Sequence, residues 1–296
     1  MATNTLVLAT EFEYLEGQNL DDVLAWLAEY REKARVLAGG TDLLVKMKSG
    51  VLQPEYIIYL KKVAALNFIR TSATGLEIGA VTTLQEIESH ETIKTYYSAL
   101  YEAVRSMAAT AIKDMGTIGG NLGNASPAAD TAPPLLVYGA DLKLASQRGE
   151  RLIPVEEFFL GPGKANLALD ELITEVIIPH PGAVAGSSFL KLGRVAADIA
   201  KINVAVCLQR SGRTCAGCRI AFGSVAPTPI RVEEAEGILA GKEFNEELLT
   251  VAAAAGAAAI RPITDNRSTQ EYRLRVSKVM LAEALRAAWQ RAGGEL

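Results

Sequence analysis

A run rich in glycine, residues 115–130, has the residue types that can hold a phosphate group. It reads Met-Gly-Thr-Ile-Gly-Gly-Asn-Leu-Gly-Asn-Ala-Ser-Pro-Ala-Ala-Asp, with four glycines among small hydroxyl and amide side chains. Glycine allows close approach to the main chain, and successive N–H groups in such a turn can converge on an anion. The functional interpretation places the amides of Gly119 to Asn121 on phosphate oxygens and the Asp130 carboxylate on ribose hydroxyls. A simple turn, with Asp130 capping the next run, is the alternative.

A second glycine turn, residues 38–44, reads Ala-Gly-Gly-Thr-Asp-Leu-Leu and lies between two apolar runs. A short buried strand is expected over residues 36–38, so the turn follows a strand, as in sites where N–H groups cradle a pyrophosphate. The turn is not GxGxxG, and no strand–helix–strand unit with a distal acidic residue follows it. A tight turn in which Thr41 or Asp42 caps the next helix explains it equally well. Two such turns in one chain favour a bound dinucleotide.

Other reactive side chains are few. Cys215 and Cys218 have the CxxC spacing of a metal site or a redox pair, but the chain adds only one further cysteine and two histidines. A tetrahedral metal site needs about four ligands, so we interpret the pair as a turn between two strands. A solvated strand end would explain the charged cluster formed by Lys191, Arg194, Asp198 and Lys201. With so few histidines, a bound cofactor is expected to supply the chemistry.

Composition excludes several classes of protein. The 296 residues include 49% hydrophobic and 22% charged residues, an ordinary globular balance with material for two or three compact units. The net charge of −4 gives no reason to expect a nucleic acid or an anionic membrane as partner. No apolar run approaches the ~18–20 residues of a membrane helix. The N-terminus lacks a basic leader followed by an apolar core, so the cytoplasm is the expected compartment.

Strands and helices are expected to alternate in both halves of the chain, which predicts an α+β or α/β fold. Hydrophobic patterning indicates strands at residues 36–38, 57–60, 76–80, 142–145, 152–155, 171–178, 202–208 and 219–222. It indicates helices starting at residues 20 and 83, with Asn19 as the cap of the first, and helices over residues 97–111, 233–240, 246–260 and 272–292. A Pro/Gly/Ala/Ser segment, residues 180–188, is the candidate domain boundary.

Taken in order, these segments resemble the flavoprotein subunit of the molybdenum hydroxylases, the xanthine dehydrogenase and carbon monoxide dehydrogenase group. In that family an AGGTDLL turn and a TIGGN…SPAAD stretch bind FAD, and both occur here almost letter for letter. The resemblance spans most of the chain, at residues 159–164, 170–173, 189–191, 198–201, 221–231 and 271–273. The segments at residues 161–164 and 226–231 look closest to separate FAD subunits of bacterial xanthine dehydrogenases.

The resemblance implies an α+β fold in two domains. Residues 1–180 would form a two-part FAD-binding domain of the vanillyl-alcohol-oxidase (PCMH) type, and residues 186–290 a smaller α+β C-terminal domain of the CO dehydrogenase flavoprotein type. It places around the FAD pyrophosphate Val36, Leu37, Ala38, Gly39, Gly40, Thr41, Asp42 and Leu43. It places on the phosphate and flavin side Thr117, Gly119, Gly120, Asn121 and Asn124. Asp130 would hold the ribose, Ile173 would contact the flavin or adenine, and Lys191 would approach the isoalloxazine carbonyls.

The resemblance also implies partners and an activity. Electrons would pass from a molybdopterin large subunit, through the [2Fe–2S] clusters of a small subunit, to FAD on this chain and then to NAD⁺ or another acceptor. Asp198 would lie on a mobile segment near the flavin edge. Alternatives are a carbon monoxide dehydrogenase medium subunit, a flavin-free assembly protein of the same fold, and a free-standing FAD oxidoreductase. One departure is Lys113, where many relatives have arginine; lysine loses the planar bidentate hydrogen bonding.

Overall fold

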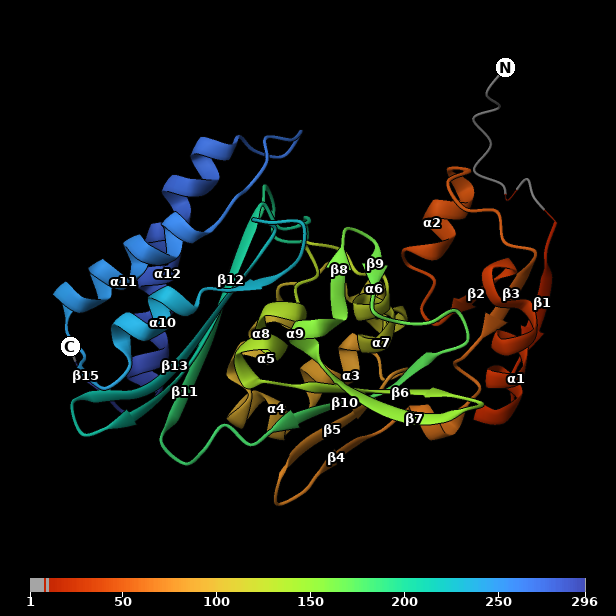
Figure 1. Ribbon diagram of the computed structural model, residues 1–296, viewed down its shortest axis with the longest axis horizontal. Coiled ribbons are helices and arrows are strands. Elements are labelled where there is room, and N and C mark those ends of the chain that lie inside the picture. Colours follow the sequence, from red (N-terminus) through yellow and green to blue (C-terminus); the bar gives the residue numbers. More distant parts are fainter. Residues whose placement is uncertain (1–7, 9–10, 296) are drawn as a thin grey trace.

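The computed structural model describes residue 8 and residues 11–295 of the chain. Three main sheets, each with its helices, follow one another along the long axis of the molecule (Figure 1). The first two form a two-part domain, and the third forms the smaller C-terminal domain, so the expected α+β architecture is confirmed. Within the described residues, no helix has the length and apolar character needed to cross a membrane.

The N-terminal part is a small parallel sheet with one covering helix. In spatial order its strands are β1 (Glu13–Glu16), β3 (Tyr56–Tyr59) and β2 (Ala34–Leu37). Helix α1 (Leu20–Tyr30) begins where the Asn19 side chain accepts the N–H of Asp22, as the sequence predicts, and its buried face joins Ile58 in one core. The short helix η1 (Arg31–Lys33) leads into β2. The first glycine turn then joins β2 to α2 (Leu43–Lys48).

The central part is a five-stranded antiparallel sheet in the order β4-β5-β10-β6-β7. Its strands are β4 (Ile69–Thr71), β5 (Gly75–Gly79), β6 (Asp141–Ser146), β7 (Gly149–Pro154) and β10 (Leu172–Pro179). Its other elements are η2 (Ala64–Leu66), α3 (Leu84–Ser89), α4 (Glu91–Tyr96), α5 (Ser98–Arg105), α6 (Thr110–Met115), α7 (Ile118–Gly123), α8 (Ala132–Tyr138), α9 (Val155–Phe158) and the hairpin β8 (Phe159–Gly161)–β9 (Lys164–Ala165). Helices α5 and α8 contact the C-terminal sheet, and one core contains residues of both sheets.

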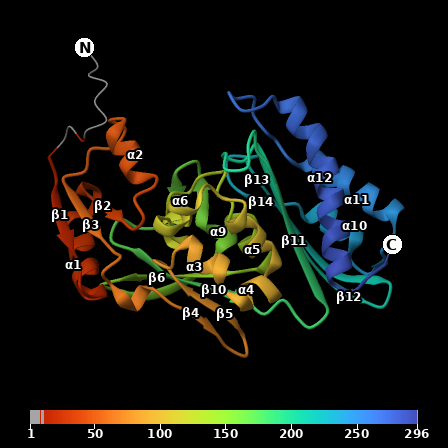
Figure 2. The same ribbon diagram turned by 180° about the vertical axis from the view of Figure 1, so that it is seen from behind.

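The C-terminal domain is an antiparallel sheet whose far face is covered by helices (Figure 2). Its strands are β11 (Ala185–Leu192), β12 (Ile202–Ser211), β13 (Thr214–Gly223), β14 (Ile230–Arg231) and β15 (Lys242–Glu243). Its helices are α10 (Glu233–Leu239), α11 (Glu246–Ala259) and α12 (Gln270–Arg291). The period-two alternation in β12 buries Ile202, Val204, Val206 and Leu208 against these helices, which confirms the strand predicted there.

Two local expectations were wrong. The helix expected over residues 97–111 ends at Arg105, because Ala108 has a φ of 37° and the chain turns there before α6 begins. The second glycine stretch is mostly the six-residue helix α7 rather than an open turn. Thr117 caps α7 by accepting the N–H of Gly120, and Gly119 lets the helix lie against Ala80. Tertiary contact therefore stabilises a helix in a sequence of low helix propensity.

Candidate cofactor-binding site

The two glycine segments, far apart in the sequence, touch each other. A Cβ on Gly39 would stand 2.2 Å from the carbonyl oxygen of Met115 and 2.7 Å from the Cα of Gly116. Gly40 has a φ of +73°, a conformation that glycine adopts at little cost. Glycine at these two positions therefore allows the turn after β2 to lie directly against the segment between α6 and α7. The sequence predicted two glycine turns; the second segment contains helix α7 instead, and the structure brings the two segments together.

Side chains tie the segments at a second point. Asn124, at the end of α7, donates from Nδ2 to Asp42 Oδ1 at 3.0 Å and accepts from Lys46 Nζ. Between the two contacts, a Cβ on Gly120 would stand 3.8 Å from the Cβ of Ala38 and 3.0 Å from Thr117 Oγ1. A Cβ on Gly123, one turn on, would stand 3.8 Å from Ile173 Cδ1 of β10. The predicted site residues Ala38, Asp42, Gly120, Asn124 and Ile173 therefore lie close together, and Lys46 and Gly123, which were not predicted, lie among them.

The backbone amides of the two segments differ in what they donate to. In α7, Gly119 donates to Ala80 O, and Gly120 and Asn121 donate to the side chain and carbonyl of Thr117. The sequence interpretation expected these amides to bind phosphate, but their hydrogen bonds within the protein leave them no longer free to do so. In the first turn, by contrast, the amides of residues 39, 40 and 41 find no backbone acceptor within the described part of the chain. Backbone donors without a backbone partner therefore lie in the turn after β2.

Asp130 and Lys191 form a buried ion pair between the two domains. Lys191 Nζ lies 2.7 Å from Asp130 Oδ2, and both side chains are less than a tenth exposed. Asn203 Nδ2 donates to the other carboxylate oxygen of Asp130 at 2.7 Å, and the neighbouring Thr131 donates to Asn121 Oδ1 at 2.6 Å. Burial raises the pKa of Asp130 above its ordinary value, while Lys191 and Asn203 oppose that rise. The pair is therefore joined to α7 through Thr131.

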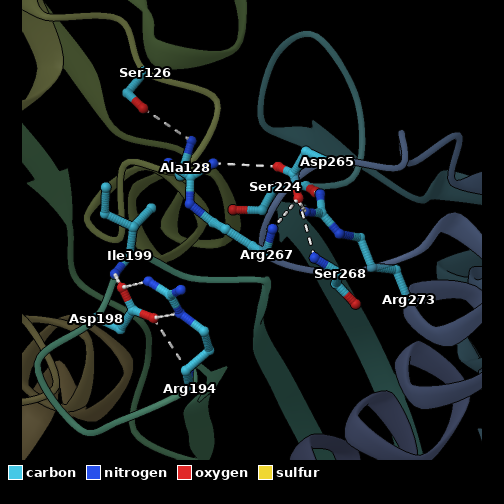
Figure 3. A network of polar contacts seen from close by, with 10 residues as sticks. All are labelled: Ser126, Ala128, Arg194, Asp198, Ile199, Ser224, Asp265, Arg267, Ser268 and Arg273. Atoms are coloured by element: carbon cyan, nitrogen blue, oxygen red, sulfur yellow. Dashed lines mark hydrogen bonds and ion pairs between the residues drawn. The ribbon is translucent and has the colours of Figure 1, made fainter.

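A pocket of about 470 Å³ opens beside this pair. Its lining includes Lys191, Arg105 and Arg194, and it lies where α5 ends and β11 leads into the following loop. Arg194 Nε donates to Asp198 Oδ2 at 2.6 Å (Figure 3). The Arg194 side chain is the main cause of the lowered pKa of Asp198, which is about 2. Two members of the predicted charged cluster, Lys191 and Arg194, thus line the pocket, and Arg194 forms an ion pair with a third, Asp198.

The cysteine pair does not lie in a turn. Cys215 and Cys218 are both in β13, where a bulge opposite Gln209 and Arg210 shifts the register and brings both thiols to one side of the strand. Cys215 is fully buried in the C-terminal core. Within the described residues, no group of three or more His, Cys, Asp or Glu could hold a metal ion. The pair is therefore part of the core.

Lys113, the departure noted in the sequence, is buried and pairs with Glu88 at the end of α3. This pair holds α6 against α3, and α6 leads directly to the carbonyl that faces Gly39.

Sequence reasoning also missed Asn203 and Lys46 as parts of the candidate site. Asn203 was visible only as a polar residue in an alternating strand, where solvent exposure was the natural expectation.

Two family models match successive segments of the chain. Residues 10–181 match the family described as the FAD binding domain in molybdopterin dehydrogenase. The chain belongs to this family. Residues 187–288 match the CO dehydrogenase flavoprotein C-terminal domain, so the family's two-domain arrangement is present. FAD is therefore the cofactor of this chain. The chain is an oxidoreductase subunit of the molybdenum hydroxylase family.

Relatives in this family have different substrates. The chain is 32% identical to the glyceraldehyde dehydrogenase medium chain of Sulfolobus acidocaldarius, over 93% of this chain and 98% of that one. It is also 32% identical to the putative xanthine dehydrogenase FAD-binding subunit of Escherichia coli, over 96% of this chain and 98% of that one. A solved carbon monoxide dehydrogenase from Hydrogenophaga pseudoflava superposes with a TM-score of 0.93 at 33% identity, covering 96% of this chain and 99% of that one.

Proposed function

We propose that this chain is the FAD-binding subunit of a cytoplasmic molybdenum hydroxylase complex most like xanthine dehydrogenase. It would receive electrons from [2Fe–2S] clusters on a small subunit, which obtain them from a molybdopterin large subunit, and pass them to NAD⁺ or another acceptor. FAD supplies the ability to take electrons singly and release them as a hydride. The observation that carries the proposal is the contact between the two glycine segments. Beside this contact, the backbone N–H groups of residues 39, 40 and 41 have no backbone acceptor among the described residues. Residues 1–180 and 186–290 are its proposed domains.

The site residues have distinct proposed roles. Within the segment of residues 36–43, the amides of residues 39, 40 and 41 donate to the pyrophosphate, since they have no backbone acceptor among the described residues. Thr117, Gly119, Gly120, Asn121 and Asn124 form the facing wall, with Gly120 leaving room for close approach. Ile173 offers an apolar contact, and Lys191 offers a cation that favours extra negative charge on the flavin ring. To accept a ribose hydroxyl, Asp130 would exchange a contact with Lys191 or Asn203.

Purification tests this function directly. The protein should be yellow, bind one FAD per chain, and copurify from its source with a large and a small subunit. Alone it should show little turnover beyond slow NADH oxidation. A colourless protein that does not take up added FAD would overturn the proposal in favour of a flavin-free assembly protein. Flavin bleaching by a small substrate without partners would favour a free-standing oxidoreductase.

A carbon monoxide dehydrogenase medium subunit is the second candidate within the family. The medium chain of Hydrogenophaga pseudoflava is 32% identical to this chain, the same level as the xanthine dehydrogenase subunit. Testing the copurified complex with a purine, an aldehyde and carbon monoxide separates these substrates. Reduction of NAD⁺ by the complex, compared with an artificial dye, identifies the acceptor.

A further inference from the structure

The first turn of α12 is fixed to the end of β13 by one buried arginine. Arg273 is 4% exposed, and its Nη1 donates to the carbonyl oxygen of Ser224 at 2.9 Å. Its Nη2 donates to Asp265 Oδ1 at 2.6 Å (Figure 3). That same oxygen accepts hydrogen bonds from the backbone N–H groups of Arg267 and Ser268, so the carboxylate also fixes the turn that follows Asp265. Arg273 therefore holds Ser224 from a rigid support.

The end of β13 in turn contacts the turn that carries Asp130 and Asn203, one of the two side chains that hold its carboxylate. The N–H of Ser224 donates to the carbonyl oxygen of Pro127 at 2.8 Å, three residues before Asp130. The preceding residue, Gly223, lies against Asn203: a Cβ there would stand 2.2 Å from Asn203 Oδ1. Ser224 has a φ of 63°, which is unusual for serine and indicates that its surroundings fix this conformation. The contacts thus run from the C-terminal helix to the proposed ribose ligand.

This path holds unused hydrogen-bonding capacity. Of four buried side-chain atoms without a partner among the described residues, three lie on it: Asn203 Oδ1, Ser224 Oγ and Arg273 Nε. Buried polar atoms are ordinarily satisfied, and a fully satisfied network has no reason to change partners. The free acceptor on Asn203, whose Nδ2 donates to Asp130, allows this side chain to take a new partner when the carboxylate exchanges a contact for a ligand hydroxyl, while Ser224 stays in place.

We propose that Arg273 is a positioning residue for the FAD site. Through Ser224 it holds the 126–130 turn and the Gly223–Asn203 contact, so that the Asp130 carboxylate faces the cofactor at a fixed angle. The C-terminal domain thus sets part of the geometry of a site whose glycine segments belong to the first domain. This inference rests on the proposed function, because its ligand is FAD.

The test compares Arg273→Met and Arg273→Lys in the full-length protein with Arg275→Met, an exposed arginine of the same helix, as control. Titration of the apoprotein with FAD gives the affinity, visible circular dichroism reports the flavin environment, and the melting temperature of the apoprotein reports stability separately. Arg273→Met should weaken FAD binding about tenfold, the effect of one charge-assisted hydrogen bond, and alter the flavin dichroism. Arg273→Lys should recover part of both, and Arg275→Met should match the parent protein.

A lower melting temperature with unchanged FAD affinity and dichroism in Arg273→Met would show a structural role only and overturn the inference. If that variant does not fold, Asp265→Asn weakens the support of Arg273 while keeping the arginine. It should then give a smaller loss of affinity, and parental affinity would overturn the inference. Failure of the parent protein itself to bind FAD would instead overturn the proposed function.

Discussion

Lys191 Nζ of β11 lies 2.7 Å from Asp130 Oδ2 of the first domain, and the two side chains are 6% and 7% exposed. Bringing both charges out of water is costly, so such a pair adds little to stability compared with an apolar contact of the same shape. Removing one partner, however, leaves an uncompensated charge. The pair is therefore a sensitive junction between the domains, and its two groups are those that the family resemblance assigns to the cofactor.

The exchange Lys191→Met should lower the free energy of unfolding by about 3–5 kcal/mol at pH 7, because Asp130 loses its ion-pair partner. Burial already raises the pKa of Asp130 above 3.8, and without Lys191 it rises further. A carboxyl whose pKa is raised on folding stabilises the fold below its unfolded-state pKa, and that stability is lost as pH rises through the folded-state pKa. Urea unfolding at several pH values from 4 to 7 should show a growing deficit. Adding Asp130→Asn should remove that pH dependence; a deficit independent of pH contradicts the prediction.

Gly120→Val should leave a folded but colourless protein. The new side chain would start 3.0 Å from Thr117 Oγ1 and extend toward Ala38, filling the space between the two glycine segments. Absorbance at the flavin bands measures bound FAD, and far-ultraviolet circular dichroism checks the fold. Gly237→Val, at a helical glycine whose Cβ would meet nothing within 4 Å, is the matched control and should retain FAD. Full flavin content in Gly120→Val would remove this glycine from the site.

Asp265 should contribute stability that acid removes. Burial acts to raise its pKa, but hydrogen bonds from the Arg267 backbone, the Arg273 side chain and the Ser268 backbone outweigh it and hold the pKa at about 2. A carboxyl with a lowered pKa stabilises the fold above its unfolded-state value of 3.8, and that contribution is lost as pH falls toward 2. Urea unfolding should show Asp265→Asn less stable than the parent at pH 6, with the gap narrowing between pH 4 and pH 2. A constant gap would refute the assignment.

Cys215→Ser should reduce stability without reducing flavin content. Cys215 is fully buried in the C-terminal core, and a serine hydroxyl there costs about 1–3 kcal/mol when it lacks a good partner. Cys218→Ser, at a partly exposed position of the same strand, should cost less. Urea unfolding measures the loss, and absorbance measures the flavin. A folded Cys215→Ser protein without FAD would show that the thiol serves the site.

Local signals in the sequence predicted much of the fold. Asn19 caps α1 as the sequence predicts, because a cap depends on residues only three positions away. Thr83, where the sequence predicted the start of a helix, is the cap of α3. The alternation of β12 likewise predicts the strand and the residues that pack against the C-terminal helices, although Asn203 and Ala205 on its other side are buried as well. The two glycine turns were found for the same reason, since glycine is informative wherever the backbone must approach another segment.

What the sequence could not predict depends on distant contacts. Helix α7 depends on the contact of Gly119 with Ala80, and apart from the Thr117 cap the glycine stretch has little that favours a helix. The amides of Gly119 to Asn121, which the sequence interpretation assigned to phosphate, instead donate hydrogen bonds to Ala80 and Thr117. Asn203 reaches Asp130 across 73 positions of sequence, and no local pattern indicates such a partner. The resemblance to a family predicted the candidate site residues, whereas the hydrogen bonds among them depend on the tertiary structure.

The contact between Gly223 and Asn203, together with the hold of Arg273 on Ser224, has a consequence for biosynthesis. A ribosome delivers the chain from its N-terminus, and the glycine segments emerge long before β13 and α12. If Arg273 positions Asp130 as proposed, this carboxylate reaches its final orientation only when nearly the whole polypeptide has been translated. We then expect FAD capture to be a late maturation step, and a nascent chain interrupted before α12 to leave the ribosome with an unfinished site for its cofactor.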